Sequence, residues 1–169
     1  MKLRFLGLFC LFTALDSSAV HAAGRSPSAD ACEAPRSLRP GQSACVRLRA
    51  SEVANNTHLL LRAGEVYDFR CDSQYWKDLV AKVSPAGDAP AAYRAYMTLF
   101  SCLKRCPHAP WFALIGKTTT SDDHCFLIGS GLVAFKVQQT GVLRCFANDA
   151  LGFYWNNSGE VYLTVKRRR

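Results

Sequence analysis

Residues 141–166 read GVLRCFANDALGFYWNNSGEVYLTVK, and this stretch decides the fold class. In residues 160–166 apolar side chains alternate with polar ones, which places one valine, one leucine and another valine on the same face. Such alternation is typical of a strand with one buried face. Residues 141–147 form a second strand-like run, and the Asn- and Gly-rich residues 148–159 between them are typical of a loop. The stretch therefore predicts two strands joined by a long polar loop.

Short strand-like runs of the same kind also precede this stretch. They cover residues 44–49, 58–62, 65–71, 111–117, 125–129 and 132–137. Turns rich in Gly, Asn, Asp and Ser separate most of them. Several short strands with such turns favour an all-β sandwich or jelly roll.

Residues 91–104 differ from the strand-like runs. They contain no Gly or Pro, and four large apolar residues recur at helical spacing: Tyr96, Leu99, Phe100 and Leu103. This spacing predicts one short amphipathic helix, ended by Cys106 and Pro107, that covers an open end of the sandwich.

The amino-terminal residues indicate export. Residues 1–22 combine a cationic start, an apolar run at 5–15 and small residues before Ala23, which is the pattern of a secretory signal peptide. Residues 23–42 are rich in Ser, Pro, Ala and Arg and predict an extended or disordered lead-in. Residues 43–169 then form one domain. No later run is long enough for a transmembrane helix, so we expect a periplasmic or secreted protein.

Seven cysteines follow the signal peptide, and in an exported chain this number predicts disulfides rather than a metal–thiolate site. Cys32 with Cys45 is one natural pair, and Cys102 with Cys106 is another. Connectivity does not follow from spacing, so both pairs are hypotheses.

The chain is basic, with a formal net charge of +8. Loss of Lys2, Arg4 and Asp16 with the signal peptide leaves a charge of +7. The basic residues are scattered, except in residues 166–169, and no aromatic–basic stacking motif accompanies them. This distribution favours a solvated cationic surface over nucleic-acid binding, with adhesion to anionic glycans as the alternative.

The loop of residues 148–159 carries the densest polar cluster. Asp149, Asn156 and Asn157 offer one carboxylate and two amide oxygens, and Gly152 and Gly159 allow the chain to curl. Calcium prefers oxygen ligands of these kinds. The alternative is a turn whose side chains only hydrogen-bond their own backbone.

The pattern N-D-x-x-G-x-Y-x-N-N-S-G in this loop resembles the calcium loop of the LecA-type galactophilic lectins. These are calcium-dependent bacterial lectins with a galactose-binding-like β-sandwich. Weaker similarities lie upstream, at residues 63–66, 85–88 and 113–117. The resemblance implies the same sandwich fold, bound Ca²⁺, a glycan or cell-envelope polysaccharide as partner, and a homo-oligomer.

The resemblance also implies site residues. The calcium ligands would be the side chains of Asp149, Asn156 and Asn157 with the carbonyls of Phe153 and Lys77. The sugar contacts would come from Asp149, Ala150, Asn156, Trp155 and Asp88. The family's His and Gln sugar contacts have no counterpart in residues 89–105, so the resemblance does not specify the sugar.

Aromatic faces stack on sugar rings, and three tryptophans are candidates for this role. Trp155 lies in the loop itself and is the strongest candidate, followed by Tyr75 and Trp76. Trp111 starts a predicted strand, so we expect it to pack in or around the core.

Nothing in the sequence favours an enzyme. His124 and Cys125 are neighbours in a predicted strand and would point to opposite faces. Asp122 and Asp123 form an ordinary loop pair without a recognisable catalytic scheme. Two functions remain: an exported calcium-dependent carbohydrate-binding protein, or a periplasmic structural or interaction protein on the same fold without a working sugar site.

Overall fold

The computed structural model of the chain describes residues 37–72 and 75–168. The helices are the α-helix α1 (Ala91–Thr98) and two short 3₁₀ helices, η2 (Ser101–Leu103) and η3 (Tyr154–Asn156). The strands are β1 (Ser43–Arg49), β2 (Asn55–Leu61), β3 (Val66–Cys71), β4 (Trp76–Asp78), β5 (Ala81–Val83), β6 (Leu114–Lys117), β7 (Phe126–Leu127), β8 (Gly131–Lys136), β9 (Gly141–Ala147), β10 (Asn157–Ser158) and β11 (Glu160–Arg167).

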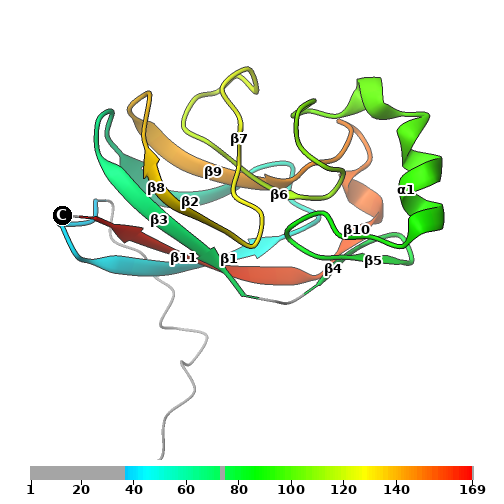
Figure 1. The fold of residues 1–169 in the computed structure, drawn as a ribbon, viewed down its shortest axis with the longest axis horizontal. Coiled ribbons are helices and arrows are strands. Elements are labelled where there is room, and N and C mark those ends of the chain that lie inside the picture. The colour runs from blue at the N-terminus through cyan, green and yellow to red at the C-terminus, as the bar shows by residue number, and fades with distance from the viewer. Residues whose placement is uncertain (1–36, 73–74, 169) are drawn as a thin grey trace, which may run out of the picture.

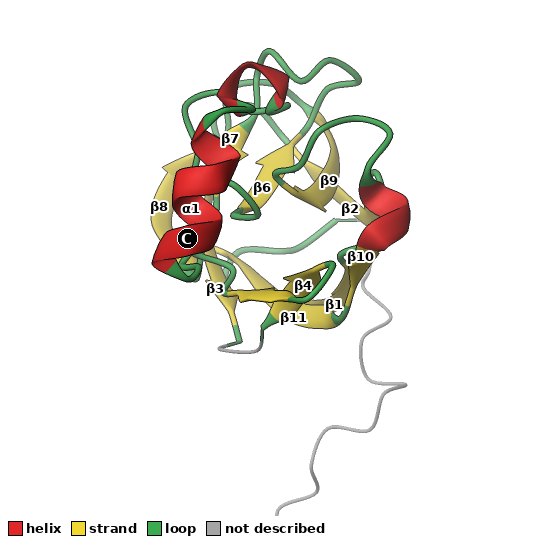
Figure 2. Cartoon of the chain, turned by 90° about the vertical axis from the view of Figure 1, so that its right-hand side faces the viewer, coloured by secondary structure: helices red, strands yellow, loops and turns green. Residues whose placement is uncertain are grey.

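Two antiparallel four-stranded sheets form the layers of a β-sandwich. One sheet has the order β1-β11-β3-β8 and the other has the order β2-β9-β6-β7. A smaller sheet, β10-β4-β5, continues the sandwich at the end where α1 lies (Figures 1 and 2). The predicted all-β sandwich is therefore confirmed.

The core lies between the two large sheets. Val161, Leu163 and Val165 on β11 are fully buried, which confirms the face that their alternation predicts. Leu59 on β2 and Leu143 on β9 belong to the same buried cluster from the opposite sheet. Each such side chain contributes roughly 1.5–3 kcal/mol when it is removed from water, so this core fixes the positions of the loops at the sandwich end.

The sequence pattern did not predict the small sheet. Its strands are only two or three residues long, which is too short for a visible alternation. On β4, Trp76 and Asp78 are buried while Lys77 between them is exposed. In the register of the small sheet, Asn157 on β10 lies opposite Asp78, and Ser158 lies opposite Lys77.

The predicted short helix is confirmed, but it is shorter than residues 91–104 and its buried side chain is not one of the four expected. The α-helix ends at Thr98, and the 3₁₀ helix η2 follows it after a turn. Met97 is the buried side chain of α1, whereas the residues expected to pack remain exposed by 37–77%: Tyr96, Leu99, Phe100 and Leu103. The helix lies at one end of the sandwich, as expected (Figure 1).

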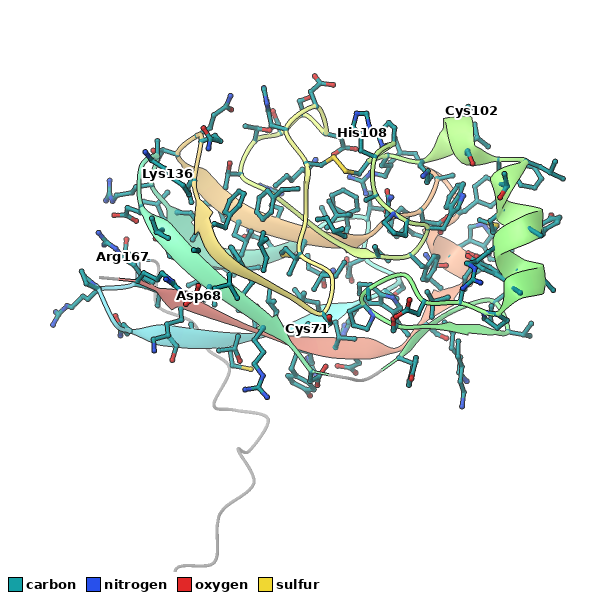
Figure 3. All side chains as sticks on the ribbon, viewed as in Figure 1. Asp68, Cys71, Cys102, His108, Lys136 and Arg167 are labelled. Atoms are coloured by element: carbon teal, nitrogen blue, oxygen red, sulfur yellow. A yellow bond between two sulfur atoms is a disulfide. The ribbon has the colours of Figure 1, made fainter. Side chains whose placement is uncertain are left out.

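The cysteine pairing also differs from the hypothesis. Cys106 forms a disulfide with Cys125, so Cys106 is not paired with Cys102. Cys102 is exposed beside the end of α1, and Cys71 is buried in the core (Figure 3). Cys32 lies outside the described residues, as does the signal peptide predicted for residues 1–22.

Two arginines of the basic carboxyl end form ion pairs. Arg167 contacts Glu65 at 2.7 Å, and Arg168 contacts Asp68 at 2.7 Å. Asp68 and Arg167 lie at the end of the sandwich opposite α1 (Figure 3). These pairs neutralise two of the basic residues in this run.

Part of the predicted lead-in belongs to the domain. Leu38 is 2% exposed and packs in the main core, and the Gly41 N–H donates to the Arg167 carbonyl. Residues 23–36 lie outside the described part of the chain. In residues 37–72 and 75–168, no helix has the length and apolar character that a bilayer crossing requires.

Candidate functional site

A cavity of about 320 Å³ opens at the end of the sandwich. The lining comes from α1, the segment after β4 and the loop between β9 and β10. Asp78, Asp149 and Asn156 form its polar part. The remaining wall is mostly apolar and aromatic, including Tyr96, Met97, Phe100, Leu103 and Trp111. A largely apolar cavity with a few convergent polar groups is the usual form of a small-ligand site.

Asp149 is the buried carboxylate of the loop between β9 and β10. It is 3% exposed. One carboxylate oxygen accepts the Ala150 backbone N–H at 2.7 Å, and the other accepts the Asn157 side-chain amide at 2.9 Å. Ala150 is fixed in turn, because it forms a β-bridge with Lys104. The loop therefore holds the Asp149 carboxylate rigidly at the cavity.

Asn156 and Asn157 carry the unusual feature of the site. Both side-chain amide carbonyl oxygens are buried without a hydrogen-bond partner among the described residues. The N–H₂ groups do have acceptors: Asn156 donates to Asp78 at 3.2 Å, and Asn157 donates to Asp149 and, at 3.5 Å, to the Ala50 carbonyl. Leaving a buried polar atom unpaired costs about 1–3 kcal/mol, so each of these two oxygens is a candidate ligand for a bound cation.

Asp78 completes the cluster from β4. It is 9% exposed, and its second carboxylate oxygen accepts the Tyr93 hydroxyl at 2.6 Å. Tyr93 is on α1, so this hydrogen bond ties the helix to the small sheet. Sequence reasoning missed both residues. The buried–exposed–buried order of Trp76, Lys77 and Asp78 places Asp78 on the inner face, but a strand of three residues is too short to show this in the sequence.

The electrostatics of the cluster oppose two buried negative charges. Burial raises the pKa of Asp149, and the Asp78 charge adds to this rise, while the N–H donors of Asn157 and Ala150 act in the opposite direction. Burial and the Asp78 carboxylate also raise the pKa of Tyr93. Within residues 37–72 and 75–168, neither Asp78 nor Asp149 forms an ion pair.

The structure brings most of the predicted calcium ligands to one place. Asn157 donates to Asp149, and Asn156 lines the same cavity as Asp149 and Phe153. The Phe153 carbonyl accepts the Asn156 N–H at 3.2 Å and keeps a second lone pair. The Lys77 side chain is exposed, and its neighbour Asp78 is the residue whose side chain reaches the cluster.

Two of the predicted sugar contacts lie apart from the cavity. Asp88 is exposed and accepts the Ser84 hydroxyl at 3.1 Å in a turn, and Trp155 is 78% exposed. Neither residue is among those that line the cavity. Ala150 does line it.

The other tryptophans exchange their expected roles. Trp76, expected as a stacking surface, is fully buried and donates its indole N–H to the Phe112 carbonyl at 2.9 Å. Trp111, expected to pack, lines the cavity, and its buried indole N–H has no acceptor among the described residues. Trp111 therefore offers a hydrogen-bond donor to a ligand.

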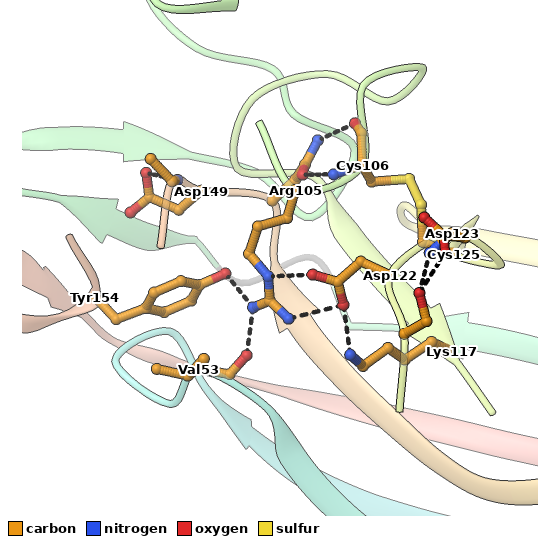
Figure 4. A network of polar contacts seen from close by, with 12 residues as sticks. Val53, Arg105, Cys106, Lys117, Asp122, Asp123, Cys125, Asp149 and Tyr154 are labelled. Carbon is orange, nitrogen blue, oxygen red and sulfur yellow. Dashed lines mark hydrogen bonds and ion pairs between the residues drawn. A yellow bond between two sulfur atoms is a disulfide. The ribbon is translucent and has the colours of Figure 1, made fainter. Parts of the chain in front are cut away.

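A network of charges supports the back of the site (Figure 4). The Arg105 guanidinium donates to Asp122 at 2.8 and 3.1 Å and to the Tyr154 hydroxyl at 2.8 Å. Tyr154 lies in η3 and donates to the Ala147 carbonyl at 2.6 Å. Burial raises the pKa of Tyr154 to about 12, so its hydroxyl stays protonated and donating at neutral pH. Arg105 thus anchors the loop that carries Asp149.

The donor set fits a hard cation such as Ca²⁺. Two carboxylates and two unpartnered amide oxygens are the ligand types that Ca²⁺ prefers. In residues 37–72 and 75–168, no group of three or more His, Cys, Asp or Glu side chains is placed to hold a metal ion. The oxygen donors present here, carboxylates and amides, suit a hard cation better than a soft one.

Comparison with known proteins supports the fold. No family model matches the chain, and no curated protein matches it. Among solved structures, the chain is similar to "EclA N-terminal domain; PllA-like lectin", with a TM-score of 0.54 and 21% sequence identity over 73% of this chain and 95% of that one. At this identity the likeness shows the sandwich fold that the two chains share.

Proposed function

We propose that the chain is a calcium-dependent carbohydrate-binding protein rather than an enzyme. One observation carries the proposal: the buried amide oxygens of two neighbouring asparagines have no partner among the described residues, and each amide donates to a carboxylate that forms no ion pair there. Both carboxylates, of Asp78 and Asp149, and the first of these amides, of Asn156, line the cavity. A divalent cation would satisfy all four groups at once. The solved structure that shares the fold is described as a lectin.

One set of residues would bind the cation. Asp149, Asn156 and Asn157 would hold the cation, with the carbonyls of Phe153 and Lys77 as further ligands. Bound Ca²⁺ supplies coordination positions that neutral sugar hydroxyls can fill.

The cavity wall would contact the sugar itself. The Trp111 indole N–H would donate to a hydroxyl, and the apolar wall would pack against the C–H faces of the ring. Trp155, exposed on the same loop, would meet the parts of a larger glycan that extend out of the cavity.

Export is part of the proposal. Residues 1–22 have the pattern of a secretory signal peptide, and the Cys106–Cys125 disulfide is typical of proteins in oxidising compartments. We therefore propose a periplasmic or secreted protein that binds a glycan or an envelope polysaccharide.

A glycan array tests the function directly. The processed protein is applied once with CaCl₂ and once with a chelator, beside the variants Asp149→Ala and Asp123→Ala. Asp123 is an exposed loop carboxylate, so its variant controls for lost surface charge. We expect glycan binding by the wild type and the Asp123 variant in calcium, and loss of binding with chelator or in the Asp149 variant.

Other outcomes separate the alternatives. Binding that ignores the chelator would contradict the role of calcium. A folded protein that binds neither Ca²⁺ nor any glycan would contradict the proposal and leave a structural or interaction protein on this fold.

A further inference from the structure

Asp78 is a buried carboxylate that the fold alone does not explain. It lies on β4 directly opposite Asn157 on β10. Cross-strand partners in an antiparallel pair have side chains on the same face, about 4.5–5.5 Å apart at Cβ. Asp78 therefore projects toward the same cluster as the loop ligands, although it comes from a segment more than 70 residues earlier in the chain.

The contacts of Asp78 join it to that cluster. One of its oxygens accepts the Asn156 amide at 3.2 Å, and the carbonyl oxygen of that same amide has no partner. Its other oxygen accepts the Tyr93 hydroxyl at 2.6 Å. Asn157, which is 5% exposed, likewise has an unpartnered carbonyl oxygen beside Asp149. Two buried carboxylates and two unpartnered oxygens thus form one contiguous group.

Charge balance makes the arrangement unfavourable without a cation. A buried ionised carboxylate is costly unless it is paired, and like charges that are close together add to that cost. Two hydrogen bonds to Asp78 from neutral donors reduce the cost without cancelling the charge. The two positive charges of a divalent cation would neutralise both carboxylates.

We infer that Asp78 is a second carboxylate ligand of the cation held by Asp149, Asn156 and Asn157, and that Tyr93 positions the Asp78 carboxylate. The inference rests on the proposed function and adds a ligand that the loop pattern alone does not contain. The helix α1 is then coupled to the ion through Tyr93. The bound cation consequently fastens together three parts of the fold: α1, β4 and the loop between β9 and β10.

Calorimetric titration with CaCl₂ tests the inference without any sugar. The processed wild type is compared with Asp78→Asn, Tyr93→Phe and the control Asp123→Asn. Affinity for calcium depends on ligand charge, so we expect Asp78→Asn to weaken binding at least tenfold. Partners that orient a metal ligand typically change affinity by about 10–100-fold, and we expect Tyr93→Phe to fall at the lower end of this range. Asp123→Asn should bind as the wild type does.

Thermal unfolding in chelator distinguishes a ligand from a structural carboxylate. Asparagine preserves the shape of Asp78 and removes one of two buried like charges, so Asp78→Asn should keep or raise the melting temperature in chelator. In CaCl₂ the same variant should gain less stability than the wild type, because ligand stabilisation follows affinity. A lower melting temperature in chelator, with unchanged gain from calcium, would overturn the inference.

The failures of the two proposals are distinguishable. If the wild type binds Ca²⁺ and Asp78→Asn binds it equally well, Asp78 is not a ligand and the loop site stands. If Tyr93→Phe alone binds as the wild type does, the positioning role of Tyr93 is overturned. If the wild type takes up no Ca²⁺, the calcium site itself is overturned, and Asp78 falls with it.

Discussion

The side-chain amide of Asn148 connects two segments of the chain next to the candidate site. Asn148 is fully buried, and its side-chain oxygen accepts the Cys106 backbone N–H at 2.9 Å. Its amide nitrogen donates to the carbonyls of Cys106, Ala109 and Pro110 at 2.9–3.2 Å. One residue before Asp149, it thus fixes the segment of residues 106–110 against the site loop.

Replacing Asn148 should reveal the strength of this anchor. Asn148→Ala leaves a buried N–H and several carbonyls without partners, each worth roughly 1–3 kcal/mol. We expect the free energy of unfolding in denaturant to fall by about 2–4 kcal/mol. Gln139→Ala, at an exposed position, should change it by less than about 0.5 kcal/mol. Equal free energies of unfolding for the two variants would show that the Asn148 hydrogen bonds do not stabilise the fold.

Residue roles were only partly predictable from the sequence. Asp149, Asn156 and Asn157 stand close together in one loop, so local sequence was enough to group them. Asp78 joins them only because β4 pairs with β10. A strand of three residues is too short for the sequence to predict this pairing. Asn148 looks like another turn residue in the sequence, and only burial reveals its three carbonyl acceptors.

At the scale of elements, ion pairs connect segments that the sheets do not join. Asp122 contacts Arg105 and Lys117, whose side chains are 5% and 6% exposed. Burial raises the pKa of Asp122, but the hydrogen bonds and charges of Arg105 and Lys117 outweigh it and hold the pKa below the ordinary value of 3.8. Removing one partner of a buried ion pair is strongly destabilising, by about 3–5 kcal/mol.

The Asp122 pairs should give a specific pH dependence. Because the folded-state pKa is lowered, the stabilisation is complete above the ordinary pKa and is lost as pH falls through the folded value. We expect Asp122→Asn to lose about 2–3 kcal/mol at neutral pH, less than for a fully buried pair because Asp122 is partly exposed. The stability difference from the wild type, measured by denaturant unfolding, should shrink below pH 3.8. A difference that is constant with pH would contradict this account.

The disulfide makes a second connection between elements. Cys106 and Cys125 are 19 residues apart and join the segment after η2 to the strand β7 region. Closing a loop of this length stabilises a fold by about 3 kcal/mol in the chain-entropy model. The double variant Cys106→Ser/Cys125→Ser should therefore lower the melting temperature, and reductant should do the same to the wild type only. A wild-type melting temperature that is insensitive to reductant would show that the disulfide contributes little.

The predicted helix is confirmed, but tertiary packing rather than the apolar spacing decides which of its side chains are buried. Four apolar residues have helical spacing, yet Met97 is the buried residue of α1 and Tyr93 packs against the core. The four residues are Tyr96, Leu99, Phe100 and Leu103. An eight-residue helix gains most of its stability from such packing. Spacing alone does not identify which apolar face meets the sandwich, and here the exposed face stands beside the cavity instead.

At the scale of the whole molecule, the sandwich was predictable because its strands alternate. The β11 face of Val161, Leu163 and Val165 is buried as its pattern requires. The small β10-β4-β5 sheet and the cavity were not predictable, because they depend on contacts between distant segments. Local periodicity is therefore enough to predict the fold. The site depends on contacts between distant segments at one end of the sandwich.

Binding a cation at that closure should stabilise the entire domain. Ligands that bind only the folded state raise its stability by about 2.7 kcal/mol at a hundred times the dissociation constant. The melting temperature of the wild type should thus rise with CaCl₂, and the melting temperature of Asp149→Ala should not. Equal shifts in both proteins would indicate a salt effect without a specific site.

The most direct measurement is a crystal structure of the processed protein grown in CaCl₂. The account predicts one peak of calcium density in contact with the Asp149 carboxylate and the amide oxygens of Asn156 and Asn157. It is contradicted if the density there is empty at saturating calcium and the two amide groups still donate to Asp78 and Asp149.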